Sequence, residues 1–98
     1  MSVQLVIELQ EAKGAQAVLH AVDAYKKRLQ SSIDRTKRNL AKFEKRYAVE
    51  TAHFLKEMTA EDLEGGDIEY VTWAGEAEIL AGLESELREL VNANYQLP

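Results

Sequence analysis

The sequence offers few side chains of the kinds that catalyse reactions or hold metal ions. It has two histidines, His20 and His53, and no cysteine. A zinc site needs about four ligands at a recurring spacing, and neither histidine has a second histidine or a cysteine beside it. The ligand set of a di-iron helical bundle and the Lys-Ser or Lys-Thr of a phosphate-binding loop are also missing. We therefore expect no catalytic residues, no metal site, no cofactor and no enzymatic activity.

Charged residues are plentiful and unevenly distributed. Residues 1–56 contain 11 Lys and Arg against 6 Asp and Glu, whereas residues 57–98 contain one Arg against 11 acids. Among these acids, Glu76, Glu84 and Glu86 have the pattern of a solvated helix surface. Two halves of opposite charge attract when they fold onto each other, although each exposed pair adds only ~0.2–1 kcal/mol.

The basic residues between positions 27 and 46 form the more distinctive set. Wound at ~100° per residue, seven of them fall in an arc of about 100° that points away from the apolar residues of the same helix. Such a stripe suits phosphates or an acidic protein, or simply keeps the helix soluble. No aromatic residues interleave it, and the net charge of −5 opposes nucleic acid. Nucleic-acid binding is the alternative function, through Lys27, Arg28, Arg35, Arg38, Lys42, Lys45 and Arg46.

The element that presents this stripe is a long helix predicted over residues 12–47. From Ala15 to Tyr47, positions in alternating steps of four and three are apolar or aromatic in eight cases of ten. This is the period of a helix with one narrow apolar seam that other helices must cover. Lys26 and Thr36 interrupt the seam, where polar residues fix register at a cost in stability. The alternative for Lys26 is a packed stem with its ammonium group in solvent.

A connector over residues 48–66 follows, with a short helix and then local stop and start signals. Thr59 can cap a turn with Asp62 three residues later. Gly65 and Gly66 stop that turn, because glycine readily adopts the left-handed conformation. Asp67 is a good N-cap for the next helix, predicted from about Ile68 within a segment of residues 67–93. Near its start we expect Trp73 to plug the end of the core.

Two long helices joined by a compact connector predict a single all-α domain, residues 1–98, folded as an antiparallel hairpin. At ~1.5 Å per residue the first helix is roughly 50 Å long, whereas a compact chain of this size has a radius of gyration of about 13 Å. We therefore expect an elongated hairpin that dimerises into a four-helix bundle. The expected self-association residues are Leu19, Val22, Leu29, Ile33, Leu40, Phe43, Leu80, Leu83, Leu87 and Leu90.

The N-terminal segment, residues 1–11, has a different period. Val3, Leu5 and Ile7 alternate with other residues, as in a β-strand. A lone strand leaves its backbone unpaired, so its partner edge would come from another copy or another protein. The alternative extends the long helix backwards, which Gly14 weakens by about 1 kcal/mol relative to Ala.

Two glycines in the second long helix also suggest partner binding. Gly75 and Gly82 are seven residues apart and share a face, where a smooth strip lets another helix come close. The alternative is that the helix simply tolerates them, at about 1 kcal/mol each. With the N-terminal residues, the candidate partner-binding set is Val3, Leu5, Ile7, Gly75 and Gly82.

The absence of cysteine fits a reducing compartment, and the longest apolar run, residues 5–7, is too short for a membrane span. We therefore expect a soluble cytoplasmic protein with no membrane association.

Two stretches resemble a known family. Residues 33–47 read I-D-R-T-K-R-N-L-A-K-F-E-K-R-Y, and residues 65–76 read G-G-D-I-E-Y-V-T-W-A-G-E. They resemble small prokaryotic helical-hairpin proteins with Phe-Glu-x-x-Tyr-Gly at one helix end and Gly-Asp-x-x-Tyr/Phe-x-x-Trp at the next helix start. Those proteins are predicted antitoxins of small toxins in archaea and cyanobacteria. The resemblance spans roughly residues 33–91 and rests on Phe43, Glu44, Tyr47, Asp67, Tyr70 and Trp73.

The resemblance has two departures, Ala48 where the family has Gly and Thr72 where it often has Glu. It implies a non-enzymatic protein that binds and neutralises a toxin. The residues by themselves indicate only an interaction module, for which a structural coiled-coil adaptor is a further alternative to the antitoxin that the resemblance implies.

Overall fold

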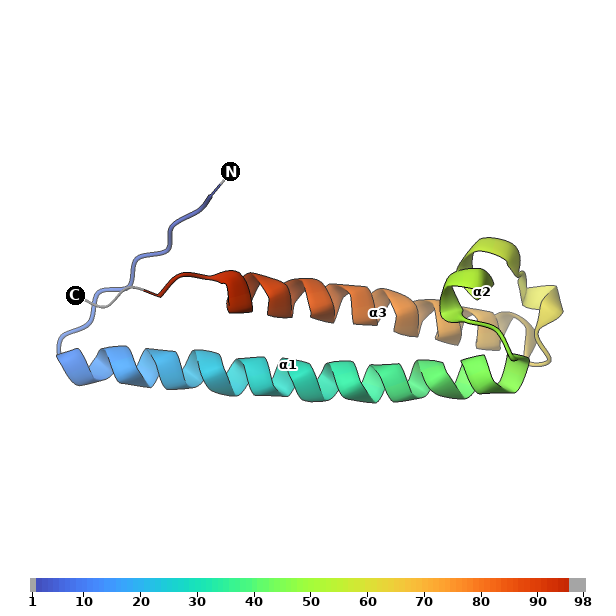
Figure 1. Ribbon diagram of the computed structural model, residues 1–98, viewed down its shortest axis with the longest axis horizontal. Coiled ribbons are helices and arrows are strands. Elements are labelled where there is room, and N and C mark those ends of the chain that lie inside the picture. Colours follow the sequence, from blue (N-terminus) through green and yellow to red (C-terminus); the bar gives the residue numbers. More distant parts are fainter. Residues whose placement is uncertain (1, 96–98) are drawn as a thin grey trace.

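The protein is an elongated helical hairpin. The computed structural model describes residues 2–95, which form α1 (Ala12–Tyr47), α2 (Thr51–Glu57), a single 3₁₀ turn η1 (Ala60–Asp62) and α3 (Gly66–Asn92). α1 and α3 lie side by side and antiparallel, and α2 packs against the end where the chain reverses (Figure 1). The molecule measures 59 × 27 × 19 Å with a radius of gyration of 19.0 Å. The predicted all-α hairpin is confirmed.

The apolar seam of α1 is the side that faces α3. None of its ten positions from Ala15 to Tyr47 is exposed, and Leu29, Ile33 and Leu40 are buried. Thr36 is buried among them, and its hydroxyl donates to the carbonyl oxygen of Ser32 in the same helix at 2.9 Å. The Thr36 hydroxyl is therefore satisfied within α1, and its role in the register of a four-helix dimer stays a prediction.

Polar contacts beside the seam hold the two long helices in register. Three glutamates of α3 meet α1: Glu76 accepts from Asn39, Glu84 pairs with Lys37 at 4.0 Å, and Glu86 accepts from Tyr25. Glu86 is exposed and Glu84 partly so, in line with the predicted solvated surface, but all three glutamates also contact α1. The reason is geometric, since a narrow two-helix seam leaves its flanking positions within reach of the partner helix.

The core is concentrated at the closed end of the hairpin. Trp73 and Phe54 are fully buried and lie parallel with ring centroids 3.8 Å apart, while Phe43 stacks on Trp73 at 5.2 Å. The indole N–H donates to the hydroxyl of Thr51 at 3.0 Å, which satisfies the only polar atom of the indole. The predicted role of Trp73 as the plug of this end is confirmed.

Local signals terminate and start the helices around this core. α1 ends at Tyr47, and Ala48 adopts the left-handed conformation with φ 55°. The Thr59 amide donates to the Asp62 carboxylate at 2.8 Å, as the predicted cap requires. Gly66 has φ +61°, and α3 begins there, so Asp67 lies inside the first turn and is not the N-cap that the sequence predicts.

The N-terminal segment adds no element to the fold. Residues 2–9 have no regular secondary structure, and α1 begins at Ala12, so the alternative in which the helix extends backwards is wrong. No strand is present between residues 2 and 95 to supply the edge that the segment would need.

None of the described helices combines the length and apolarity required to cross a membrane.

Candidate protein-interaction surfaces

The first candidate surface is the N-terminal segment, residues 3–9. Its five large apolar side chains are between 44% and 95% exposed, with Val3 and Leu5 the most exposed of them. The segment leaves the open end of the hairpin, where α1 begins and α3 ends (Figure 1). Residues 3–9 therefore form an exposed, largely apolar segment whose backbone N–H and C=O groups are not used in a helix or a sheet. This is the arrangement that strand addition to a partner sheet uses.

The second candidate surface lies on α3, turned away from the leucine seam. We call Ile68, Val71, Gly75, Ile79 and Gly82 the α3 outer stripe. At ~100° per residue they fall within an arc of about 80° that contains no other residue between positions 68 and 82. Ile68, Val71 and Ile79 are 83%, 68% and 53% exposed. The helix therefore has two apolar sides, and only one of them is covered by α1.

The two glycines of this stripe have no explanation within the chain. A Cβ added at Gly75 or Gly82 meets nothing within 4 Å. Each glycine lowers helix stability by about 1 kcal/mol relative to Ala. By contrast, a Cβ at Gly65 would come within 2.8 Å of the Glu69 Cβ, so the fold does require glycine there.

Acidic residues border the α3 outer stripe. Asp67 and Glu78 lie along one edge, and Glu89 continues the arc toward the end of the helix. All three are exposed, and none takes part in an ion pair within residues 2–95. Arg88, the only cation of α3, is roughly 140° from the centre of the stripe. The stripe therefore has an apolar centre and a negative border along one edge.

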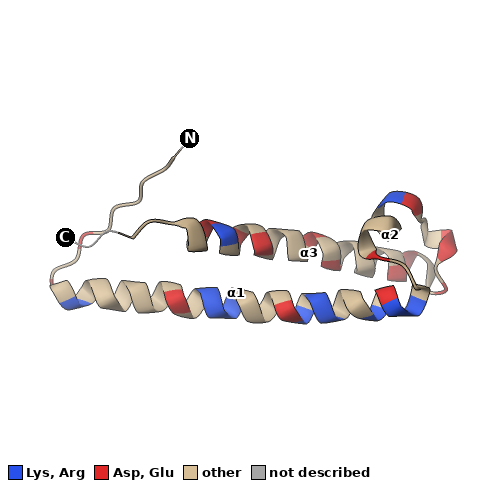
Figure 2. Ribbon diagram, viewed as in Figure 1, with Lys and Arg blue, Asp and Glu red and all other residues tan. Residues whose placement is uncertain are grey.

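The third candidate surface is the outer side of α1, where Lys and Arg recur along the helix (Figure 2). Arg46 is the exception in the predicted stripe, because its guanidinium donates to Glu64 and Glu69 at 2.8 Å each. The hydrogen bond to Glu64 and the charge of Glu69 raise the pKa of Arg46. Lys27 pairs with Asp23 of the same helix. Within residues 2–95 the other five members of the predicted stripe form no ion pair: Arg28, Arg35, Arg38, Lys42 and Lys45.

The residues expected to drive self-association divide into two groups. Leu29, Ile33 and Leu40 are buried within a single hairpin, so they hold α1 against α3. The remaining members are half-buried. They are Leu19, Val22, Phe43, Leu80, Leu83, Leu87 and Leu90. Most of them lie along the open half of the hairpin, beyond the reach of α2.

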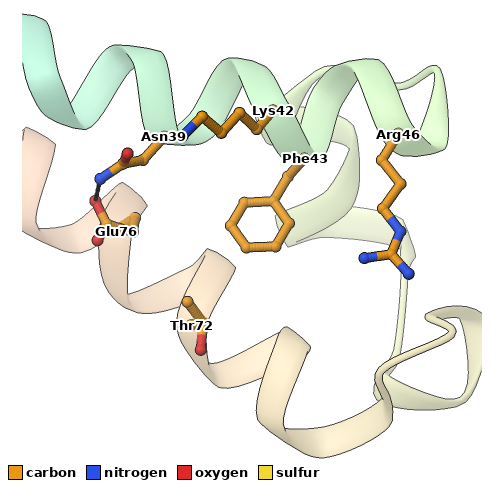
Figure 3. A pocket seen from close by; sticks show the side chains of 6 residues that line it. All are labelled: Asn39, Lys42, Phe43, Arg46, Thr72 and Glu76. Atoms are coloured by element: carbon orange, nitrogen blue, oxygen red, sulfur yellow. Dashed lines mark hydrogen bonds between the residues drawn. The ribbon is translucent and has the colours of Figure 1, made fainter.

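Two open cavities flank the seam on either side of α3. One, of about 350 Å³, is shown in Figure 3, where the Phe43 ring projects from α1 toward Thr72 and Asn39 donates to Glu76. The other, of about 520 Å³, is lined mainly by Leu40, Leu55, Leu80 and small alanines. Residues 2–95 contain no cluster of three His, Asp or Glu placed to hold a metal ion.

Comparison with models of known families, with curated proteins and with solved structures yields no match. The surfaces described above are therefore the basis on which function is inferred.

Sequence reasoning did not identify Ile68, Val71 and Ile79 as surface residues. A signal was present, because positions 68, 71, 75, 79 and 82 repeat the three-and-four spacing of the seam. The run of leucines at the seam is stronger and conceals this second periodicity.

Proposed function

We propose that this protein is a non-enzymatic, cytoplasmic protein-binding module that dimerises and acts as an antitoxin, binding and neutralising a partner toxin. The observation that carries the proposal is the N-terminal segment, with five exposed large apolar side chains in seven residues. Apolar surface of this kind on a folded chain marks a protein–protein contact. The resemblance of residues 33–91 to small prokaryotic antitoxins supplies the class of partner.

The half-buried leucines support the dimer. Two helices cover only a strip of each other, so Leu83, Leu87 and Leu90 keep part of their surface in water. A second hairpin packed on the open half would bury this surface in a four-helix bundle. Sedimentation equilibrium is the direct test, since a chain of 11.1 kDa would sediment at about twice that mass. A monomer at all concentrations contradicts the dimer.

The antitoxin role is tested by co-expression with the small reading frame adjacent to the gene. We expect rescue of growth and co-purification of the two proteins. Leu5→Asp should abolish both, because it places a charge on the alternating apolar face of the N-terminal segment. Gln4→Asp is the matched control, with one added carboxylate on the opposite face. No rescue by the wild type, or equal behaviour of the two variants, contradicts the proposal.

Nucleic-acid binding through α1 is the second candidate, favoured by a row of cations of which Arg35, Arg38 and Lys42 form no ion pair within residues 2–95. Lys13, Lys27, Arg28, Arg35, Arg38, Lys42 and Lys45 share an arc of the helix with no acidic residue in it. Duplex binding should weaken steeply with salt and disappear when Arg35, Arg38 and Lys42 are changed to Glu. Binding that ignores these changes excludes this function. A structural adaptor, the remaining alternative, would form the dimer and have no adjacent toxin.

A further inference from the structure

The α3 outer stripe is an apolar surface that no other helix of the described chain covers. α1 covers the leucine seam and α2 covers the closed end, but Ile68, Val71 and Ile79 face solvent. Gly75 and Gly82 leave open space between them and lower the stability of the helix without an internal reason. A helix surface with recessed glycines between protruding isoleucine and valine side chains is shaped to receive another helix at close range.

The negative charge along the edge of the α3 outer stripe favours a positively charged partner. Asp67, Glu78 and Glu89 line one edge of the apolar centre, and no cation of α3 lies near that edge. A second copy of α3 would bring the same carboxylates face to face, where like charges oppose association. The outer side of α1 in a second copy has the matching charge, but only His20 and small residues such as Ala24 and Ser31 lie among its cations. It lacks the large apolar side chains that would fill the stripe.

We infer that the α3 outer stripe binds a basic amphipathic helix of a partner protein, with apolar side chains against Gly75, Ile79 and Gly82 and lysines or arginines against the acidic border. The stripe from Ile68 to Gly82 is roughly 21 Å long, which corresponds to about four turns of a partner helix. This inference rests on the proposed partner-binding function and adds to it the chemistry of the partner element.

The test uses two synthetic helical peptides of about 18 residues, long enough to form helix in isolation. One has leucines on one face and lysines on the other, and the second has glutamates in place of the lysines. Fluorescence anisotropy of each labelled peptide is measured against the full-length protein. The lysine peptide should bind at least about tenfold more tightly than the glutamate peptide, and less tightly as salt is raised.

A variant with Gly75→Arg and Gly82→Arg blocks the stripe and adds positive charge to it. Arginine is a better helix former than glycine, so its melting temperature should be no lower than that of the wild type. Affinity for the lysine peptide should nevertheless fall about tenfold or more. The matched control, Ala24→Arg with Ser31→Arg, adds the same charge to the exposed side of α1 and should bind within about twofold of the wild type.

Three results would overturn the inference: equal affinity for the two peptides, no binding of either, or unchanged binding by the blocked variant. The co-expression experiment separates this inference from the proposed function. Growth rescue by the blocked variant would retain the antitoxin role and remove the stripe from it. Failure of the wild type to rescue would remove the antitoxin role, and the peptide titration would still decide whether the stripe binds a basic helix.

Discussion

The two ends of the hairpin are built differently. At the closed end, three helices enclose Trp73 and Phe54 completely, and Arg46 bridges Glu64 and Glu69 across the connector. At the open end, α1 and α3 have only each other, their seam leucines are half-buried, and the adjoining residues 3–9 lie in solvent. The closed end completes its own core and carries part of the α3 outer stripe on its surface, whereas the open end leaves its seam leucines and residues 3–9 for another molecule.

This difference concerns stability as well as shape. Segments with few buried apolar contacts open at lower free energy than the core of the same protein. We expect the open end to exchange its amide hydrogens faster than the closed end, and to gain protection when a partner or a second copy binds. The closed end also exposes apolar side chains, at Leu55, Ile68 and Val71, but these lie on helices that enclose a complete core.

The largest expected effect comes from removing the centre of the closed end. Trp73→Ala deletes a fully buried side chain together with its stacking on Phe54 and should lower the free energy of unfolding by about 3–5 kcal/mol. Leu87→Ala, at a half-buried seam position of the open end, should cost roughly 1–2 kcal/mol. Urea denaturation followed by circular dichroism measures both. Equal losses would mean that the two ends contribute equally to stability.

Substitution of glycine by alanine should have opposite effects on stability at Gly65 and at Gly75. Gly65→Ala places a Cβ 2.8 Å from the Glu69 Cβ and should destabilise the closed end by about 1–3 kcal/mol. Gly75→Ala meets open space and should stabilise α3 by about 1 kcal/mol. Thermal melting of the two variants gives the comparison. A loss of stability at Gly75 would show that the fold itself requires that glycine.

A substitution at the C-terminal end of α1 should change stability by a smaller amount, and a second substitution in the same helix serves as its control. Ala48 is held at φ 55°, a conformation that costs an alanine roughly 1–2 kcal/mol. Ala48→Gly should therefore stabilise the closed end, by about 0.5–1 kcal/mol after the greater flexibility of glycine in the unfolded chain is counted. Ala41→Gly, at an exposed position inside α1, should destabilise by about 1 kcal/mol. Chemical denaturation of both variants tests the pair.

The features that could be predicted from the sequence depend on short-range rules. The seam of α1 follows from the spacing of its apolar residues, the cap at Thr59 from the acid three positions later, and the left-handed conformation at Gly66 from the freedom of glycine. The burial of Trp73 follows from its size and its position near a helix start, where aromatic side chains fill the end of a hairpin core. Each of these depends on residues within a few turns of one another.

The features that could not be predicted depend on a second helix or a second molecule. The contact between Tyr25 and Glu86 joins residues 61 positions apart and requires the register of the hairpin, which periodicity leaves open. The exposure of Ile68 and Val71 depends on which side of α3 meets α1. The strand predicted for residues 3–9 requires an edge that residues 2–95 do not contain, so it stays a prediction about a complex.

The smallest expected effect concerns the link between Tyr25 and Glu86, which helps to hold the open end together. The phenol donates to the carboxylate at 2.5 Å, and this hydrogen bond is the main cause that raises the pKa of Tyr25 above 10.0. Because the folded state holds this proton more tightly, the stabilisation is complete below pH 10 and is lost as the pH rises through the pKa of the folded state. Tyr25→Phe should therefore melt slightly below the wild type at pH 7 to 9.

That difference in melting temperature should shrink and then reverse in more alkaline solution, where the ionised phenol repels Glu86. Thermal melts of wild type and Tyr25→Phe across this range measure it, and amide hydrogen exchange shows where the change occurs. Faster exchange confined to the open end is expected, since Trp73 and Arg46 hold the closed end without Tyr25. Uniformly faster exchange would instead mean that the two ends unfold together, and the difference between them would then be one of exposure alone.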